Sequence, residues 1–123
     1  LASVNQLHAT ARGLGQFFDR FDLLMSPTSA ELPPKIGEMS SETPGLDAFY
    51  DRFWAHSPFT CAFNASGFPA MSIPFGLSEE GLPIGVHFGA ALGGENLLFS
   101  VAGQLERAAP WADLRPDLSE FLA

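Results

Sequence analysis

Residues 70–89 read AMSIPFGLSEEGLPIGVHFG, and this stretch decides the fold class of the chain. Apolar residues alternate with small or polar ones on both sides of the segment 76–81, which begins and ends with glycine. The alternating apolar residues are Met71, Ile73, Phe75, Ile84, Val86 and Phe88. A period of two residues is typical of half-buried strands, and the connecting segment allows the two strands to pair as a hairpin. Pro74 then has to lie where the sheet needs no backbone N–H donor.

A helix and a short strand are predicted upstream of the hairpin. Apolar residues recur at helical spacing over residues 4–21, which predicts a helix of about five turns. The brief apolar run over residues 22–26 stops at Pro27, and this pattern favours a buried strand.

A loop and two helices are predicted between that strand and the hairpin. Prolines, glycines and small polar residues dominate residues 29–45, so we expect a long surface loop of the kind that shapes binding sites. An aromatic-rich helix is predicted over residues 46–57. A short helix is expected next, with Ser57 as its cap, Pro58 at its first position and Gly67 at its end.

A last helix is predicted over residues 97–108 by apolar residues at helical spacing. The element order α-β-α-α-β-β-α predicts the α/β class, with a mixed sheet covered by helices. Three strands are few for a free-standing sheet beside so much apolar helix, and Leu1 lies inside a helical pattern without a preceding methionine. Either the core is small, or residues 1–123 are a single segment that adds its strands to a larger sheet. In the second case we expect exposed apolar surface that is covered by self-association or by neighbouring molecules in a crystal.

Composition and charge exclude several classes of protein. The net charge is −8 and the six basic residues are scattered, which argues against nucleic-acid binding. Cys61 is the only cysteine, so no internal disulfide forms, and a reducing, cytoplasmic location fits. No apolar run reaches the roughly 18 residues that span a membrane. The histidines lack metal-ligand spacing, so we expect neither a metal ion nor another cofactor.

Residues with catalytic chemistry are sparse. There is no Gly-x-Ser-x-Gly turn, so a small esterase would need His56 or His87 to lie beside a serine in space. We expect His87 to be a hydrogen-bonded, half-exposed residue of a strand. We expect His56 to interact with the C-terminal end of the helix dipole.

An aromatic group around the second predicted helix is the best candidate for a binding pocket. We select Phe53, Trp54, Phe59 and Cys61 as residues that line a substrate pocket, although such residues also fill cores. The same group supports an alternative function, a non-catalytic module that docks a protein or an apolar ligand.

Three stretches in this order resemble the C-terminal part of amidase signature enzymes. They read DLLMSPT at residues 22–28, FTCAFNASGFPAMSIP at 59–74 and GLPIGVH at 81–87. The similarity extends from about Phe17 to Pro116. Enzymes of this family hydrolyse small-molecule amides through a serine acyl-enzyme, using a Ser, cis-Ser and Lys triad. The resemblance implies that this chain is the C-terminal portion of such an enzyme.

No catalytic residue is carried over from the family, because the triad lies in a glycine- and serine-rich part that is not in this sequence. The only lysine, Lys35, has a different context, so we expect the isolated segment to be inactive. Where His87 stands, the family often has glutamine. By the resemblance, the loop 28–45 and the helix 49–59 are candidates to line the substrate cleft.

The remaining matched residues are expected to have structural roles. Asn64 and Gly67 end a helix, and Pro69 fixes the start of a strand. Gly81 and Gly85 allow tight turning and close backbone approach.

Overall fold

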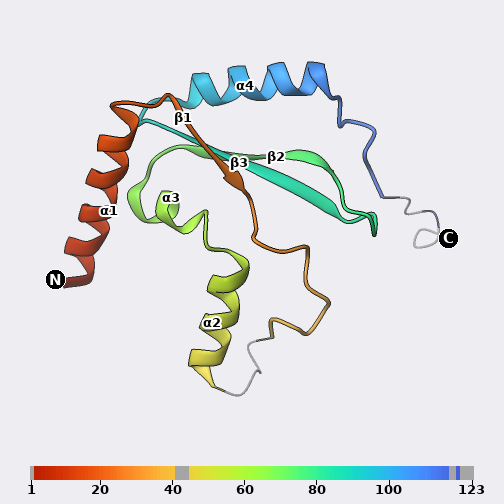
Figure 1. Ribbon diagram of the computed structural model, residues 1–123, viewed down its shortest axis with the longest axis horizontal. Coiled ribbons are helices and arrows are strands. Elements are labelled where there is room, and N and C mark those ends of the chain that lie inside the picture. Colours follow the sequence, from red (N-terminus) through yellow and green to blue (C-terminus); the bar gives the residue numbers. More distant parts are fainter. Residues whose placement is uncertain (1, 41–44, 117–118, 120–123) are drawn as a thin grey trace.

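The computed structural model describes residues 2–40, 45–116 and 119, and its elements follow the predicted order (Figure 1). The elements are α1 (Ala2–Phe18), β1 (Leu23–Pro27), α2 (Leu46–His56), α3 (Cys61–Ser66), β2 (Ala70–Leu77), β3 (Pro83–Ala90) and α4 (Glu95–Ala108). The predicted α/β class is confirmed.

The three strands form one antiparallel sheet in the order β1-β3-β2, so β3 is its central strand. The predicted hairpin is confirmed, because β2 pairs with β3 from Ala70 opposite Gly89 to Leu77 opposite Pro83. Pro74 lies in an edge strand of this sheet, next to a register shift that accommodates one extra residue, Phe75.

The expectation that β1 is a buried strand is wrong. β1 pairs only with β3, and Met25 in its middle is 70% exposed. Helix α4 packs mainly on β2 and β3, which leaves the Met25 side chain uncovered.

Helices cover the two faces of the sheet (Figure 1). On one face, Leu98 of α4 packs with Ile73, Phe88 and Ala90 in a small buried core. On the other face, the ring of Phe63 from α3 lies over β3 and is only 5% exposed. The ring fills the space that a side chain at position 89 would need, since a Cβ on Gly89 would overlap it.

Helix α1 joins this second face through aromatic contacts. The ring of Phe18 stacks on Phe68 with centroids 5.6 Å apart and meets Phe63 edge-on at 6.5 Å. Aromatic pairs in these geometries stabilise beyond the area that they bury. The sheet, α1 and α3 are therefore joined around Phe63.

The expected start of α3 is wrong, and the hydrogen bonds explain why. The N–H of Ser57 donates to the carbonyl of Phe53 at 2.9 Å, so Ser57 closes α2 instead of opening α3. Helix α3 begins at Cys61, with Thr60 at its N-cap. It ends as predicted at Gly67, whose φ of 76° is a left-handed conformation that glycine adopts without strain.

The chain exposes 9145 Å² of surface. A folded monomer of 13.2 kDa exposes about 6,400 Å², so the excess is roughly 2,700 Å². Phe75, Phe99 and Met25, each at least 70% exposed, contribute to it. The expected exposed apolar surface is therefore present. Among the described residues, no helix is both long and apolar enough to cross a membrane.

Candidate functional site

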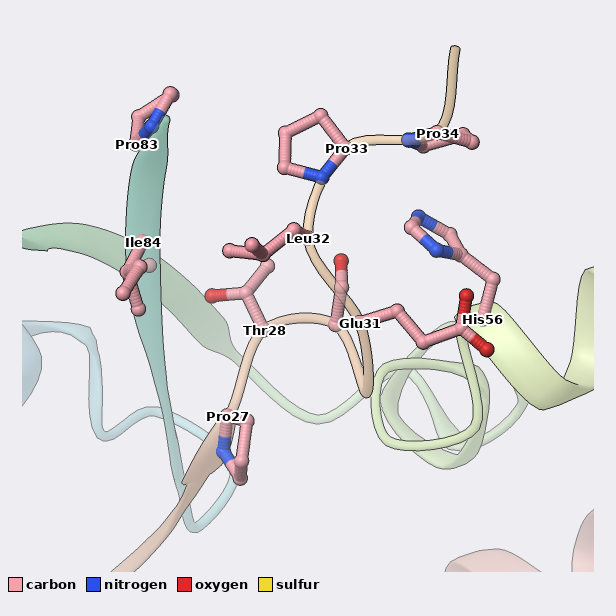
Figure 2. Close-up of a pocket in the computed structure, with 11 residues that line it drawn as sticks. Pro27, Thr28, Glu31, Leu32, Pro33, Pro34, His56, Pro83 and Ile84 are labelled. Carbon is pink, nitrogen blue, oxygen red and sulfur yellow. The ribbon is translucent and has the colours of Figure 1, made fainter. Parts of the chain in front are cut away.

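A hollow of about 300 Å³ lies where β1 ends and the following loop begins, and we call it the loop hollow (Figure 2). It is lined by Pro27, Thr28, Ser29, Glu31, Leu32, Pro33, Pro34, His56, Pro83, Ile84 and Gly85. Both segments that the family resemblance marks as cleft-lining contribute to it, the loop through residues 28–34 and the helix through His56. Residues 41–44 of that loop lie outside the described residues.

Two contacts with α2 hold the loop in position. The N–H of Ala30 donates to the carbonyl of His56, the last residue of α2, at 2.9 Å. One turn earlier, Arg52 Nη2 lies 2.7 Å from Glu31 Oε2 in a half-exposed ion pair. Such a pair contributes little to stability, up to about 1 kcal/mol, but it neutralises the acid in the lining of the loop hollow.

The sheet side of the loop hollow carries a pair of hydroxyl groups. The N–H of Thr28 donates to the carbonyl of Gly85 at 3.1 Å, and Thr28 Oγ1 lies 2.6 Å from Ser72 Oγ. A Cβ on residue 85 would lie 2.7 Å from Thr28 Oγ1 and 2.9 Å from Ser72 Oγ. The missing side chain of Gly85 thus makes room for the hydroxyl pair.

Helix α2 carries two buried side-chain nitrogens that have no hydrogen-bond partner among the described residues. They are Arg52 Nη1 and His56 Nδ1, on the same face of the helix one turn apart. Only His56 also lines the loop hollow, and Figure 2 shows its ring extending from the end of α2 toward Pro34. Buried polar atoms are nearly always paired, so these two nitrogens are exceptions among the described residues.

His87 is buried, contrary to the expectation of a half-exposed residue. It is 3% exposed, because the ring of Phe63 meets it edge-on with centroids 5.0 Å apart. Burial lowers the pKa of His87 by penalising its charged form. The expected hydrogen bond is present, since His87 Nδ1 lies 3.3 Å from Ser26 Oγ on the neighbouring strand.

The direction of this hydrogen bond bears on whether Ser26 is a nucleophile. The hydroxyl of Ser26 also donates to the carbonyl of Pro27 at 3.1 Å, and a carbonyl only accepts. The hydroxyl has a single proton, so when Ser26 donates to Pro27 it is His87 Nδ1 that donates to Ser26. A histidine that activates a serine has to accept its proton, which is the opposite arrangement.

A second hollow, of about 340 Å³, lies between α2 and α3, and we call it the aromatic hollow. It is lined by Phe53, Trp54, Ser57, Thr60, Cys61, Asn64 and Ala65. The structure thus brings together three of the four predicted pocket residues, Phe53, Trp54 and Cys61. Phe59 does not line this hollow. The thiol of Cys61 donates to the carbonyl of Pro58 at 3.2 Å.

The other residues singled out in the sequence lie at ends and turns. Asn64 is exposed on α3, and Gly67 is the C-cap of that helix. Pro69 directly precedes β2, and its carbonyl accepts the N–H of Ala90 at 3.0 Å. Gly81 has φ of 79° in the turn between β2 and β3, where its N–H donates to the carbonyl of Ser78. Across the described parts of the chain, no three His, Cys, Asp or Glu side chains gather closely enough to hold a metal ion.

Comparison with known proteins identifies the family. The family model described as Amidase matches residues 1–99. The chain belongs to the Amidase family. It is 42% identical to the 6-aminohexanoate-cyclic-dimer hydrolase of Paenarthrobacter ureafaciens, over 95% of this chain and 25% of the relative. The hydrolase of the same name from a Pseudomonas strain is 41% identical, with the same coverage.

Solved structures give the same assignment. A structure of 6-aminohexanoate cyclic dimer hydrolase matches with a TM-score of 0.87 and 41% identity, over 95% of this chain and 26% of that one. One subunit of the glutamyl-tRNA(Gln) amidotransferase of Thermotoga maritima matches with a TM-score of 0.72 and 26% identity, over 92% of this chain and 23% of that one. The chain spans about a quarter of the length of the relatives it matches, so it corresponds to a portion of an amidase.

Sequence reasoning did not single out Glu31 and Arg52 or connect His56 with them. A partial signal was present, because Arg52 and His56 are four residues apart and share one face of a predicted helix. Nothing in the sequence pattern pointed to Glu31 as the partner of Arg52.

Proposed function

We propose that this chain is the C-terminal part of an enzyme that hydrolyses a small-molecule carboxylic amide through a serine acyl-enzyme. In this proposal the reacting residues lie on polypeptide outside these 123 residues, which form a single segment of the amidase domain. The observation that carries the proposal is the TM-score of 0.87 with a solved amide hydrolase over 95% of the chain.

Within that enzyme, we assign both hollows to the wall of the substrate cleft. A structure of the cyclic dimer hydrolase in complex with its substrate aligns with this chain at a TM-score of 0.84, which supports a small-molecule amide as the substrate class. The aromatic hollow offers Phe53, Trp54 and Cys61, and the loop hollow offers His56 and Thr28. We also propose a cytoplasmic location, supported by the single cysteine.

A chimeric enzyme tests the proposal. The matching quarter of the Paenarthrobacter hydrolase is replaced by residues 1–123, and hydrolysis of the 6-aminohexanoate cyclic dimer is measured. We expect turnover by the chimera and none by the 123-residue chain alone. A folded chimera without turnover would instead favour the non-catalytic binding module.

The esterase alternative makes the opposite prediction for the isolated chain. A serine-directed phosphonate would label Ser26 if His87 activated it, and Ser26→Ala would abolish the label. We expect no label, because the hydroxyl of Ser26 is engaged by the carbonyl of Pro27.

Association between copies of the chain is a separate proposal, supported by the excess surface of roughly 2,700 Å². Sedimentation of the isolated chain at several concentrations tests it. A single monomeric species throughout would contradict it.

A further inference from the structure

We infer that His87 makes the position of β1 sensitive to acid: when its imidazole is protonated, β1 and the start of the following loop separate from β3. The separation follows from the packing of this chain alone. Its consequence for activity rests on the proposed function, which assigns the loop hollow to the wall of the substrate cleft.

The imidazole of His87 lies between the two outer strands and beneath α3. Its neighbours in the register of the sheet are Ser26 on β1 and Ser72 on β2, and the ring of Phe63 covers it. Among the described residues, Ser26 is the only hydrogen-bond partner of the imidazole. The neutral ring therefore fits a site made of hydroxyl groups and an aromatic ring.

The surrounding elements provide no charge to compensate a protonated imidazole. β1, β2, β3 and α3 contain no Asp, Glu, Lys or Arg. Apart from His87, their only titratable side chain is Cys61, whose thiol donates to the carbonyl of Pro58. The titratable side chains of α1 and of its connection to β1 are exposed; they are His8, Arg12, Asp19, Arg20 and Asp22. Glu31, in the loop after β1, is already paired with Arg52.

Hydrogen bonding does not favour the protonated form either. An imidazolium has two N–H donors, and only Ser26 is placed to accept one of them among the described residues. Burial of the ring disfavours the charged form and so lowers the pKa of His87. Protonation therefore favours any arrangement of the chain in which water reaches this ring.

β1 is the element over His87 that separates at the smallest loss of contacts. It has five residues, pairs only with β3 among the described elements, and leaves Met25 70% exposed. β2 is longer, is joined to β3 as a hairpin, and contributes Ile73 to the core. Phe63 is buried beside Phe18. Segments with few buried contacts open locally before the whole chain unfolds.

Separation of β1 removes part of the wall of the loop hollow. Thr28 lies where β1 passes into the loop (Figure 2). Its N–H donates to the carbonyl of Gly85 at 3.1 Å, and its hydroxyl oxygen lies 2.6 Å from Ser72 Oγ. Both contacts join the end of β1 to the other two strands, so both are lost when β1 separates.

The test is amide hydrogen exchange of the 123-residue chain between about pH 5 and 7.5, in low concentrations of urea and corrected for the intrinsic pH dependence of exchange. Two amides report on the two sides of β3. The N–H of Thr28 donates to Gly85 on the β1 side, and the N–H of Ala90 donates to Pro69 on the β2 side. We expect Thr28 to have the larger opening constant, with little urea dependence, and Ala90 to exchange only on global unfolding.

The pH dependence of the Thr28 opening constant follows from the titration of His87. This constant should rise by up to about tenfold per pH unit as the pH falls from 6.5 to the pKa of the closed state. His87→Gln removes the proton-binding group and keeps a side chain that can hydrogen-bond, so the rise should disappear. His8→Gln, the same change at an exposed histidine of α1, is the matched control and should keep it.

Ser26→Ala separates the hydrogen bond from the titration. It removes the partner of the imidazole, so the Thr28 opening constant should rise about fivefold at neutral pH and keep its pH dependence. Far-UV circular dichroism checks that each variant is folded. Should His87→Gln not fold, the urea and pH dependence of Thr28 in the native chain still decides the inference.

Several results would overturn the inference. These are a Thr28 opening constant that does not change with pH, one that keeps its pH dependence in His87→Gln, or equal opening constants and urea dependences for Thr28 and Ala90. Loss of protection at the N–H of Gly67, which closes α3, with Thr28 still protected would assign the movement to α3 and overturn it as well.

The chimera tests the consequence for activity. Its turnover should fall reversibly in acid, and His87→Gln should move this fall to lower pH; identical pH profiles would overturn the consequence. The exchange readout needs no turnover. A chimera inactive at every pH, beside pH-dependent exchange of Thr28, would therefore refute the proposed function alone, and an active chimera beside pH-independent exchange would refute the inference alone.

Discussion

Replacing Gly89 by alanine is expected to be among the most damaging small changes in this chain. A Cβ at this position would overlap Cε1 and Cζ of the Phe63 ring and lie 3.1 Å from Cδ1. Carbon atoms need about 3.5 Å or more, so the ring has to move by roughly 1.5 Å. Phe63 is 5% exposed and touches Phe18 and His87, so it has no free space to enter without disturbing both neighbours.

The expected loss follows from these contacts. Overpacking a core costs about 1–3 kcal/mol, and partial exposure of a phenylalanine adds about 1–2 kcal/mol. Removing a glycine from a strand returns about 0.5–1 kcal/mol. The net loss for Gly89→Ala is therefore about 3 kcal/mol, which lowers the melting temperature of a chain of this length by about 10 °C.

Urea and thermal unfolding, followed by circular dichroism and by tryptophan fluorescence, measure this change. Gly13→Ala is the matched control, because nothing lies within 4 Å of the added Cβ and the residue is inside α1. It should stabilise the chain by about 0.5–1 kcal/mol. Phe63→Leu lacks the overlapping ring atoms, so Gly89→Ala should cost about 1 kcal/mol less in that background. Equal unfolding midpoints for Gly89→Ala and the native chain would refute the reasoning.

Two further predictions concern the polar face of the sheet. Gly85→Ala should separate the hydroxyl pair of Thr28 and Ser72 and destabilise the chain by about 1–2 kcal/mol. This loss is smaller than that expected for Gly89→Ala, because small polar side chains move more readily than a buried ring. A loss as large as that of Gly89→Ala in urea unfolding would argue against this reasoning. Burial lowers the pKa of His87, so just below pH 6.5 the unfolded chain binds more protons than the folded chain. The free energy of unfolding should therefore decrease as the pH falls from about 7 through the pKa of the folded state. His87→Gln should flatten this part of the pH profile, and an unchanged slope would assign it to another group.

The elements that could be predicted from the sequence are those whose pattern is local. The alternation over residues 70–89 placed the hairpin, and helical spacing placed α2 and α4 to within a few residues. The start of α3 was misplaced because Ser57 is suited both to close the preceding helix and to open the next one. Only the fold shows that its N–H bonds back to α2.

The site depends on contacts between distant segments, which a pattern along the chain does not encode. Phe53, Trp54 and Cys61 could be predicted as pocket residues because they belong to an apolar, aromatic-rich group on two successive helices. The ion pair of Glu31 with Arg52 and the burial of His87 under Phe63 require the loop and α3 to be placed against other elements first.

The strand order has a consequence for how the chain acquires its structure during synthesis. Among the described residues, β1 and β2 both pair with β3 and not with each other, so neither strand meets its partner in this sheet until residues 83–90 have left the ribosome. Residues 28–82 are made between β1 and its partner, and closing so long a separation is slow. During that interval the strands lack their partner in this sheet, and unpaired strands are the surfaces that chaperones protect from aggregation.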